Sequence, residues 1–357
     1  MTLILSNKDV EQLLTMRECI DALEVAYLEL AAGRGLARTR SDCITPTSRP
    51  DTHYSLKSMD GVIPKFGVSA VRIDSDIVSM PKVGNNIRRV KVPAAPNDRY
   101  VGLVLLFSTE TGEPLAIFPD GVMQRMRVGA TSGLGVKHLA RRDARRIGLL
   151  GAGWQAGTQL MAACTVRDIE SIRCFSPRRE RREAFCREMS QVLNLEVVPV
   201  DQPEAALVDA DIVMCATNSE DAIFFEHWIK PGMHLSSIKK PEIDRAAIRR
   251  ANCVIIHARD NRPIVELSID LPEAITQAEG KRWPDAEDGD FKLPTLPDLI
   301  AGKITGRTSE EDVTCFLNYL GLGYQFAAAG SVVYRNAKER GVGHELPTDW
   351  FTEDVHP

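Results

Sequence analysis

Residues 144–160 read ARRIGLLGAGWQAGTQL, and this stretch decides the fold. It has the pattern of a short apolar strand, a tight glycine turn and the start of a helix, which is the context that the dinucleotide fingerprint G-x-G-x-x-A requires. Gly151 permits the turn, Gly153 leaves room for a pyrophosphate, and Ala156 lets the helix pack close to the strand. Backbone N–H groups at the helix N-terminus would bind the phosphates. The predicted cofactor contacts of the turn are Gly151, Ala152, Gly153, Trp154, Gln155 and Ala156.

The chain after this turn alternates between strand-like and helix-like segments. A polar, helix-forming run at 181–193 separates the predicted strands 172–175 and 195–199. Alternation of this kind implies βαβ units and a parallel sheet. We therefore predict an α/β fold with a doubly wound parallel sheet, a Rossmann domain, preceded by a helix over 121–139. Its later strands are expected at 172–175, 195–199, 212–216 and 254–256.

The region before the turn has a different pattern. After a predicted helix over 16–32, short β-rich stretches alternate with turns that carry Gly, Pro, Asn and Asp. These segments predict a second, β-rich domain, and the last part of the chain, 310–341, has a helical pattern. The strands of the β-rich domain are expected at 54–58, 68–73, 101–107 and 115–118.

A second group of predicted cofactor contacts follows the later strands. An acidic residue at the end of the next strand usually binds the ribose 2′-hydroxyl of NAD, but this chain has Ser176, Arg178 and Arg179 there. A hydroxyl and a guanidinium suit a 2′-phosphate, so NADP(H) is favoured and NAD(H) stays possible. Small and polar residues at other strand ends are expected to flank the ribose and nicotinamide. These further contacts are Ala216, Thr217, Asn218, Ser237 and, on the preceding helix, Thr131.

Composition excludes several classes of protein. The net charge of −5 gives no general attraction to nucleic acid. The eight cysteines are scattered without a C-x-x-C pair, so we expect small core residues in a reducing compartment, and no grouping of His and Cys predicts a metal site. The N-terminus lacks the features of a signal peptide, and no apolar run reaches membrane-spanning length. We therefore expect a cytoplasmic protein that binds no membrane, no nucleic acid and no metal.

Several stretches together resemble the ornithine cyclodeaminase and mu-crystallin family. They lie in the family's order and spacing over nearly the whole chain. The resemblance implies a Rossmann domain at 129–320 and a β-rich domain for substrate binding and dimerisation at 1–128 plus 321–357. It also implies a homodimer formed through the β-rich domains. The stretches are GEPLA at 112–116, RVGATS at 127–132, GAGWQA at 151–156, GRTSEE at 306–311 and YRNA at 334–337.

The resemblance further implies that an amino or imino acid binds between the two domains, beside the nicotinamide. An arginine near the start of the chain binds the substrate carboxylate in this family, and Arg40 is the best match, with Arg38 as a rival. Arg127 resembles a second arginine of the family site. A guanidinium binds a carboxylate through two parallel hydrogen bonds. Because Arg72 adds a third cation, the sequence predicts a substrate with more than one carboxylate.

One departure from the family pattern concerns the amine of the site. The lysine that acts on the substrate should stand at position 69, where this chain has Ser69. Arg72 can bind a carboxylate or polarise a carbonyl, but it cannot act as a base. Lys57 would supply the amine if its strand pairs alongside, and Lys91 is a weaker candidate. The predicted catalytic residues are Lys57, Arg72 and Arg127, and the predicted substrate contacts are Arg40, Lys57, Arg72, Lys91 and Arg127.

Two further departures decide between functions. The aspartate of the cyclodeaminases is missing from the loop 236–242, which reads SSIKKPE, and Asp244 lies too far along. Gln325 and Phe326 stand where many relatives carry acidic residues. Hydride transfer needs mainly a positioned cofactor and a carboxylate clamp. We therefore predict an NAD(P)-dependent reductase or dehydrogenase that acts on an imino acid or a 2-oxo or amino acid. The alternatives are an ammonia lyase like ornithine cyclodeaminase and a non-catalytic protein that binds NADPH or a small ligand.

Overall fold

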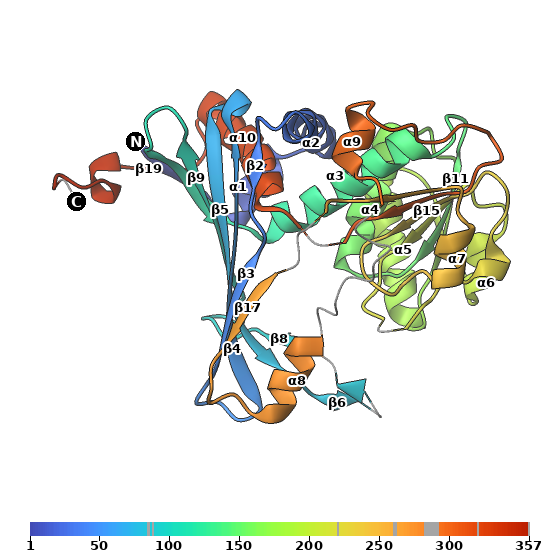
Figure 1. The fold of residues 1–357 in the computed structure, drawn as a ribbon, viewed down its shortest axis with the longest axis horizontal. Helices are drawn as coiled ribbons and strands as arrows, with labels where there is room; N and C mark the ends of the chain where they lie inside the picture. The colour runs from blue at the N-terminus through green and yellow to red at the C-terminus, as the bar shows by residue number, and fades with distance from the viewer. Residues whose placement is uncertain are drawn as a thin grey trace.

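The computed structural model describes residues 1–83, 86–87, 89–219, 221–259, 263–281, 293–319 and 321–355. Two sheets organise these residues, and each forms the centre of one half of the molecule (Figure 1). One half has a seven-stranded parallel sheet, and the other has a ten-stranded, mainly antiparallel sheet. The predicted α/β fold, with a Rossmann-like core and a β-rich domain, is confirmed.

The seven-stranded sheet has the order β13-β12-β11-β14-β15-β18-β16, and its strands run parallel. Apolar side chains cover both of its faces, because Ile147 and Leu149 pack under α4 and α5 while Leu150 packs against α6. Strands buried on both faces are typical of parallel sheets. The elements are β11 (Arg146–Leu150), α4 (Trp154–Val166), β12 (Ser171–Phe175), α5 (Arg179–Leu193), β13 (Val197–Pro199), α6 (Pro203–Leu207), β14 (Ile212–Cys215), η2 (Glu226–Trp228), β15 (His234–Ser237), α7 (Arg245–Arg250), β16 (Cys253–Ile256), α9 (Leu296–Ile300) and β18 (Thr314–Leu317).

The ten-stranded sheet has the main order β17-β3-β4-β5-β9-β10-β1-β19, and β2 and β8 add to it. Helices α2 and α10 pack on its inner face around Tyr27, Tyr324 and Phe326, and α3 leads from this half to β11. The elements are β1 (Thr2–Ile4), α1 (Asn7–Leu13), α2 (Met16–Ala31), β2 (Leu36–Ala37), β3 (Ser41–Pro46), β4 (Thr52–Ile63), η1 (Pro64–Phe66), β5 (Val68–Ser79), β6 (Lys82–Val83), β7 (Asn86–Ile87), β8 (Val90–Val92), β9 (Val101–Ser108), β10 (Pro114–Pro119), α3 (Gly121–Leu139), β17 (Ile264–Leu267), α8 (Glu273–Lys281), α10 (Gly323–Arg340), β19 (His344–Leu346) and η4 (Thr348–Phe351).

Strands β4 and β5 extend well past the predicted 54–58 and 68–73. They pair in antiparallel register over their whole length, from Thr52 opposite Ser79 to Ile63 opposite Val68. Side chains alternate between buried and partly exposed along both strands. The sequence pattern missed the strand ends because several inward positions carry charged instead of apolar side chains.

The helical interpretation of 310–341 is wrong in its first part. Residues Thr314–Leu317 form β18, a buried strand between β15 and β16, and the helix α10 begins only at Gly323. A short apolar run that is buried on both sides has no period that distinguishes strand from helix. The structure also differs from the predicted extent of the Rossmann segment, because β17 lies inside 129–320 but pairs with β3 of the ten-stranded sheet.

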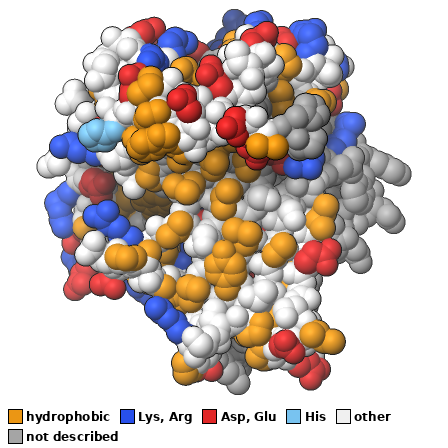
Figure 2. All heavy atoms as spheres, turned by 90° about the vertical axis from the view of Figure 1, so that its left-hand side faces the viewer, with side chains coloured by type: hydrophobic (Ala, Val, Ile, Leu, Met, Phe, Trp, Pro, Cys, Tyr) orange, Lys and Arg blue, Asp and Glu red, His pale blue; other side chains and the backbone are white. Residues whose placement is uncertain are grey.

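The outer face of the ten-stranded sheet is apolar. Leu56, Val101 and Leu103 are each more than a third exposed there. Ile73 pairs with Leu103 and Val71 with Leu105, so apolar residues also occupy neighbouring positions of this face. Figure 2 looks onto this side of the molecule and shows hydrophobic side chains gathered across it. We call this surface the outer sheet face.

Two kinds of feature are absent from the described residues. Within that part of the chain, none of the helices combines the length and apolar character needed for a membrane span. The same residues contain no group of three or more His, Cys, Asp or Glu side chains placed to hold a metal ion.

Candidate functional site

The glycine turn between β11 and α4 has the geometry that a pyrophosphate site needs. Gly151 adopts φ +121°, and a Cβ added there would lie 2.2 Å from the carbonyl oxygen of Ala216. Gly153 caps α4, and a Cβ added there would meet nothing within 4 Å, so the space above it is open. The first N–H groups of a helix have no partner within it, and the helix dipole favours an anion there. The residues of this turn therefore fit a dinucleotide.

A buried carboxylate joins the carboxyl ends of β14 and β15, beside the turn. Glu242 is fully buried and accepts five hydrogen bonds from described residues, two of them from the backbone N–H and Oγ1 of Thr217 (2.5 and 2.8 Å). The others come from Ser237 Oγ (2.9 Å) and from the N–H groups of Ile238 and Lys239 (3.1 and 3.2 Å). Burial raises the pKa of Glu242, although these hydrogen bonds oppose the rise. Glu242 thus fixes two predicted cofactor contacts, and the sequence interpretation did not identify it.

Two arginines in different environments follow β12, where the sequence predicts a 2′-phosphate contact. Arg178 is exposed at the N-cap of α5 and makes no ion pair with the described residues. Arg179 binds Glu183 in the next helical turn (2.7 Å). The N–H of Gly151 donates to the carbonyl of Phe175 (2.8 Å), so Ser176 begins directly beside the glycine turn. Of the two arginines, Arg178 is the one whose charge is uncompensated.

A large pocket lies between the two halves, with a volume of about 1180 Å³. Residues from both halves line it, so the structure brings the expected substrate contacts and part of the cofactor turn to one place. Among the predicted cofactor contacts, Thr131 and Ser237 are fully buried and bond within the protein instead, Thr131 to Tyr27 and Gln325 and Ser237 to Glu242. The predicted residues in the pocket wall are Arg40, Lys57, Arg72, Lys91, Arg127, Trp154, Gln155 and Asn218.

One wall of the pocket is a row of charged residues on the inner face of β4 and β5. Asp42, Lys57 and Asp74 lie directly opposite one another on three neighbouring strands. Lys57 Nζ contacts Asp76 and lies 3.4 Å from Asp74 Oδ2. Lys91, which is 40% exposed, reaches both carboxylates at 2.9 Å. We call Lys57, Asp74, Asp76 and Lys91 the charged row.

For Lys57 and Asp74, burial and the neighbouring charges shift the pKa in opposite directions. Burial lowers the pKa of Lys57, and the nearby carboxylates only partly restore it. Burial favours protonated Asp74, but Arg72, Lys57 and Lys91 outweigh that effect and hold the pKa of Asp74 below its usual range. Lys57 therefore gives up its proton more readily than an exposed lysine does, while Asp74 stays ionised.

Arg72 is compensated by two carboxylates. Its guanidinium lies 2.6 Å from Asp120 Oδ2 and 3.2 Å from Asp74 Oδ2. Burial disfavours its charge, but the two carboxylates raise its pKa above the usual value. Gly102 makes this pair possible, because a Cβ there would lie 2.2 Å from Asp120 Oδ1. Asp120 was not identified from the sequence because it precedes α3 and meets Arg72 only across the sheet.

Arg127 differs from Arg72 in its hydrogen-bond partners. It is 5% exposed, and its Nη1 and Nη2 donate to the amide oxygens of Gln325 and Gln124 (2.8 Å each). No carboxylate of the described residues pairs with it, and its buried Nε has no hydrogen-bond partner there. Burial and the neighbouring charge of Arg72 lower the pKa of Arg127. A buried guanidinium in this state strongly favours an added anion.

Arg72 and Arg127 flank one aromatic ring. Their guanidinium carbons lie 5.6 and 5.1 Å from the ring centre of Phe326. Gly321 leaves the space for Arg127, because a Cβ there would lie 2.3 Å from its Nη1. Positions 325 and 326, where the family resemblance implied acidic residues, thus supply the neutral and aromatic surroundings of Arg127.

Two expectations about the substrate contacts change with the structure. Arg40 is not a lone cation, since its Nε and Nη2 each bind the buried Asp42 at 2.7 Å. Ser69 lies on β5 at an odd position, whereas Arg72 and Asp74 face the pocket from even positions. A side chain at position 69 therefore points to the outer sheet face, and a serine there removes nothing from the pocket. Lys57 does lie alongside Arg72, as its strand pairing required.

Comparison with known proteins places nearly the whole chain in one family. The model of the ornithine cyclodeaminase/mu-crystallin family matches residues 1–341. A Δ(1)-pyrroline-2-carboxylate reductase of Bacillus cereus is 26% identical over 353 residues, which cover 96% of this chain and 99% of that protein. The structure of the Thermococcus litoralis Δ(1)-pyrroline-2-carboxylate reductase with NADH and L-proline superimposes with a TM-score of 0.76 at 26% identity, covering 97% and 100% of the two chains. An archaeal alanine dehydrogenase dimer with bound NAD shares the fold, with a TM-score of 0.75 at 24% identity and coverage of 97% and 99%.

Proposed function

The chain belongs to the ornithine cyclodeaminase/mu-crystallin family, and from this premise we propose that it is an NAD(P)-dependent oxidoreductase that interconverts an imino acid and an amino acid. One observation carries the proposal: Arg127 is a buried cation with no carboxylate partner among the described residues, in a pocket that also contains Trp154 and Gln155 of the dinucleotide turn. Similar proteins are Δ(1)-pyrroline-2-carboxylate reductases, which supports an imine as the substrate.

Different residues of the chain bind the substrate and supply the proton. A nicotinamide, when bound, supplies or accepts the hydride. Arg127 binds the substrate carboxylate and so orients the carbon that reacts. Lys57 holds the proton that the substrate nitrogen takes up on reduction, since burial lowers its pKa. Arg72, held by Asp120 and Asp74, is a fixed positive charge beside the carboxylate.

The same charges favour a substrate with a single carboxylate, in contrast to the expectation from three arginines. Arg40 and Arg72 already bind Asp42 and Asp120, so their charges are compensated within the protein. Arg127, in contrast, donates to the neutral amides of Gln325 and Gln124, and no carboxylate of the described residues pairs with it. A second substrate carboxylate would have to displace one of the internal ion pairs, which is costly for buried groups.

The cofactor preference follows from the end of β12. Arg178 is exposed, uncompensated and next to Ser176, which supports NADP(H) over NAD(H). The similar reductase of known structure binds NADH, so the preference of this chain rests on its own residues. Comparing the dissociation constants of NADPH and NADH by fluorescence titration tests it.

The test of the function measures hydride transfer with matched substrates and variants. We expect consumption of reduced nicotinamide with Δ(1)-pyrroline-2-carboxylate and formation of proline, and much slower turnover of iminosuccinate, a dicarboxylate. Gln325→Glu would give Arg127 a carboxylate and should raise KM for the imine, while Gln325→Met should not.

The pH dependence of the reaction tests Lys57. For reduction, kcat/KM should decrease on the alkaline side at a pH below the usual lysine value, because the protonated Lys57 is required. Lys57→Arg should move this alkaline decrease to higher pH.

Three outcomes would contradict the proposal. Conversion of ornithine to proline without net consumption of cofactor would indicate a cyclodeaminase. Tight binding of NADPH without turnover of any imine, 2-oxo acid or amino acid would indicate a binding protein. An alkaline limb unchanged in Lys57→Arg would remove the role of Lys57.

We also propose a homodimer in which two outer sheet faces pack together. Val101, Leu103 and Leu56 leave an apolar area exposed that a single chain does not cover. Sedimentation should give a dimer, and Leu105→Glu should give a monomer. The free thiols, of which most are buried and Cys43 is exposed, support a reducing, cytoplasmic location.

A further inference from the structure

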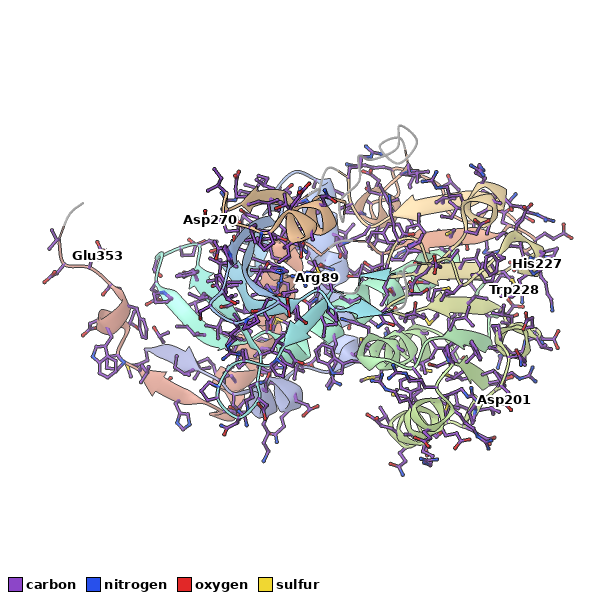
Figure 3. All side chains as sticks on the ribbon, turned by 90° about the horizontal axis from the view of Figure 1, so that it is seen from below. Arg89, Asp201, His227, Trp228, Asp270 and Glu353 are labelled. Carbon is purple, nitrogen blue, oxygen red and sulfur yellow. The ribbon has the colours of Figure 1, made fainter. Side chains whose placement is uncertain are left out.

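The described part of the chain ends with a short arm, residues 347–355, that leaves the body of the β-rich half. The strand β19 pairs with β1 at the edge of the ten-stranded sheet, and the short helix η4 follows it. Figure 1 shows this segment projecting from the sheet edge, and Figure 3 places Glu353 at its far end, away from the rest of the molecule. Thr2 and Thr348 share one hydrogen bond of 3.4 Å. Beyond Thr348, no side chain of the arm bonds to another part of the described chain.

The composition of the arm is unusual for a segment that lies in water. Trp350, Phe351 and Val355 are 70%, 40% and 72% exposed. The N–H of Trp350 donates locally, to the carbonyl of Pro347 (3.2 Å). Large aromatic side chains contribute most when they are buried, and several exposed ones together mark an interaction site. The arm is thus built to pack against something that a single chain does not provide.

The direction of the arm indicates what that partner is. The arm projects on the side of the molecule to which the outer sheet face turns, which is the side seen in Figure 2. A second copy seated on the outer sheet face would therefore lie within its reach. The matched family model ends at residue 341, so the arm follows the part of the chain that the family shares.

We propose that the arm of each protomer crosses the dimer interface and packs Trp350 and Phe351 onto the apolar outer face of the partner's sheet. The proposal rests on the dimer proposed above and adds a second, reciprocal contact to it. A two-fold axis makes both arms engage alike. The arm then contributes an aromatic residue of the kind that dominates binding energy at interfaces.

Tryptophan fluorescence tests the contact directly in the full-length protein. The emission of Trp350 is isolated as the difference between the wild type and Trp350→Phe, and acrylamide measures how accessible the indole is. In the wild-type dimer we expect quenching of Trp350 to be at least about threefold weaker than in the monomeric Leu105→Glu variant, because a packed interface excludes the solvent. Equal quenching in dimer and monomer would overturn the inference and leave the dimer intact.

The dimer dissociation constant gives an independent measurement. Trp350→Ala should raise it at least about tenfold, as expected for an aromatic hot spot. The control is Val192→Ala on α5, which removes another exposed apolar side chain (55% exposed) but lies in the other half and should change nothing. If Trp350→Ala leaves the constant unchanged, the arm does not cross the interface. If Trp350 is protected equally in Leu105→Glu, the arm folds back on its own chain, and a wild type that is monomeric at every concentration overturns the dimer itself.

Discussion

The glycine turn and the charged row both contribute residues to one pocket, but they are built in different ways. The turn owes its shape to the backbone and to small side chains: Gly151 has a positive φ, and Gly153 has open space above it. The charged row owes its properties to side chains that oppose one another, with Lys57 bound to Asp74 and Asp76 from the neighbouring strand. A site built from one local turn can be recognised in a sequence, whereas a site built from cross-strand partners depends on the register of a sheet.

The largest effect is expected from breaking the charged row at its buried cation. Lys57→Met would leave two buried carboxylates with too little positive charge, and removing one partner of a buried pair costs about 3–5 kcal/mol of unfolding free energy. Lys91→Met removes a half-exposed cation from the same carboxylates and should cost about 1 kcal/mol or less, because water screens it. Urea unfolding measures both variants. Equal losses would show that burial does not decide the strength of these pairs.

The pH dependence of stability sharpens the same point. The pKa of Asp74 is lowered in the folded protein, so its contribution is present above the unfolded value of 3.8 and is lost as the pH falls further toward the folded pKa. Lys57→Met should raise the pKa of Asp74 in the folded protein. The free energy of unfolding should then fall less steeply as the pH drops below 3.8. Urea midpoints between about pH 2 and pH 5 measure this slope, and an unchanged slope would contradict the role of Lys57.

The two glycines of the turn provide the next test, because they should fail in different ways. Gly151→Ala places a Cβ 2.2 Å from the carbonyl of Ala216 at a positive φ, so we expect a loss of about 2–3 kcal/mol of stability. Gly153→Ala meets no protein atom and should leave stability unchanged, but it should weaken cofactor binding about tenfold or more by filling the approach to the pyrophosphate. Thermal unfolding and cofactor titration separate the two effects. Full cofactor affinity in Gly153→Ala would show that the phosphates do not lie above this turn.

Arg127 lines the same pocket, and its replacement should affect the chemistry more than the folding. Arg127→Met takes away the charge that binds the substrate carboxylate, and hydrogen bonds to charged groups contribute about 1.5–3 kcal/mol each. We therefore expect kcat/KM for the imine to fall about 10- to 100-fold. Stability should not fall, because the charge has no carboxylate partner among the described residues. A large loss of stability with unchanged kcat/KM would assign Arg127 a structural role instead.

The smallest effect is expected at the edge of the turn, at Arg178. This guanidinium is exposed, so Arg178→Ala should weaken NADPH binding by about 1 kcal/mol, roughly fivefold, and leave NADH binding unchanged. Arg179→Ala serves as the control, because that arginine already binds Glu183. Equal losses for both coenzymes would place the 2′-position elsewhere.

The comparison also explains which parts of the molecule could be predicted from the sequence. The turn, its strand and its helix were recognised because all their determinants lie within 144–160. Lys57 and Arg72 were chosen as candidates, but their partners Asp74 and Asp120 were not, because the ion pairs appear only when β4, β5 and β9 align. The side of the sheet to which the side chain of residue 69 points also depends on this register. Glu242 was overlooked because a single glutamate in a loop gives no sign that two strand ends will donate hydrogen bonds to it.

The return of β17 to the ten-stranded sheet has a consequence for dissecting the molecule. The residues 264–267 leave the nucleotide-binding half, pair in parallel with β3 and are followed by α8, whose Glu279 accepts a hydrogen bond from Arg89 (2.8 Å; Figure 3). A gene fragment for 129–320 would therefore carry one strand whose partners it lacks, and a fragment for the remainder would miss a sheet edge. An exchange of nucleotide-binding halves between relatives would succeed only if β17 and α8 were kept together with the ten-stranded sheet of the same protein.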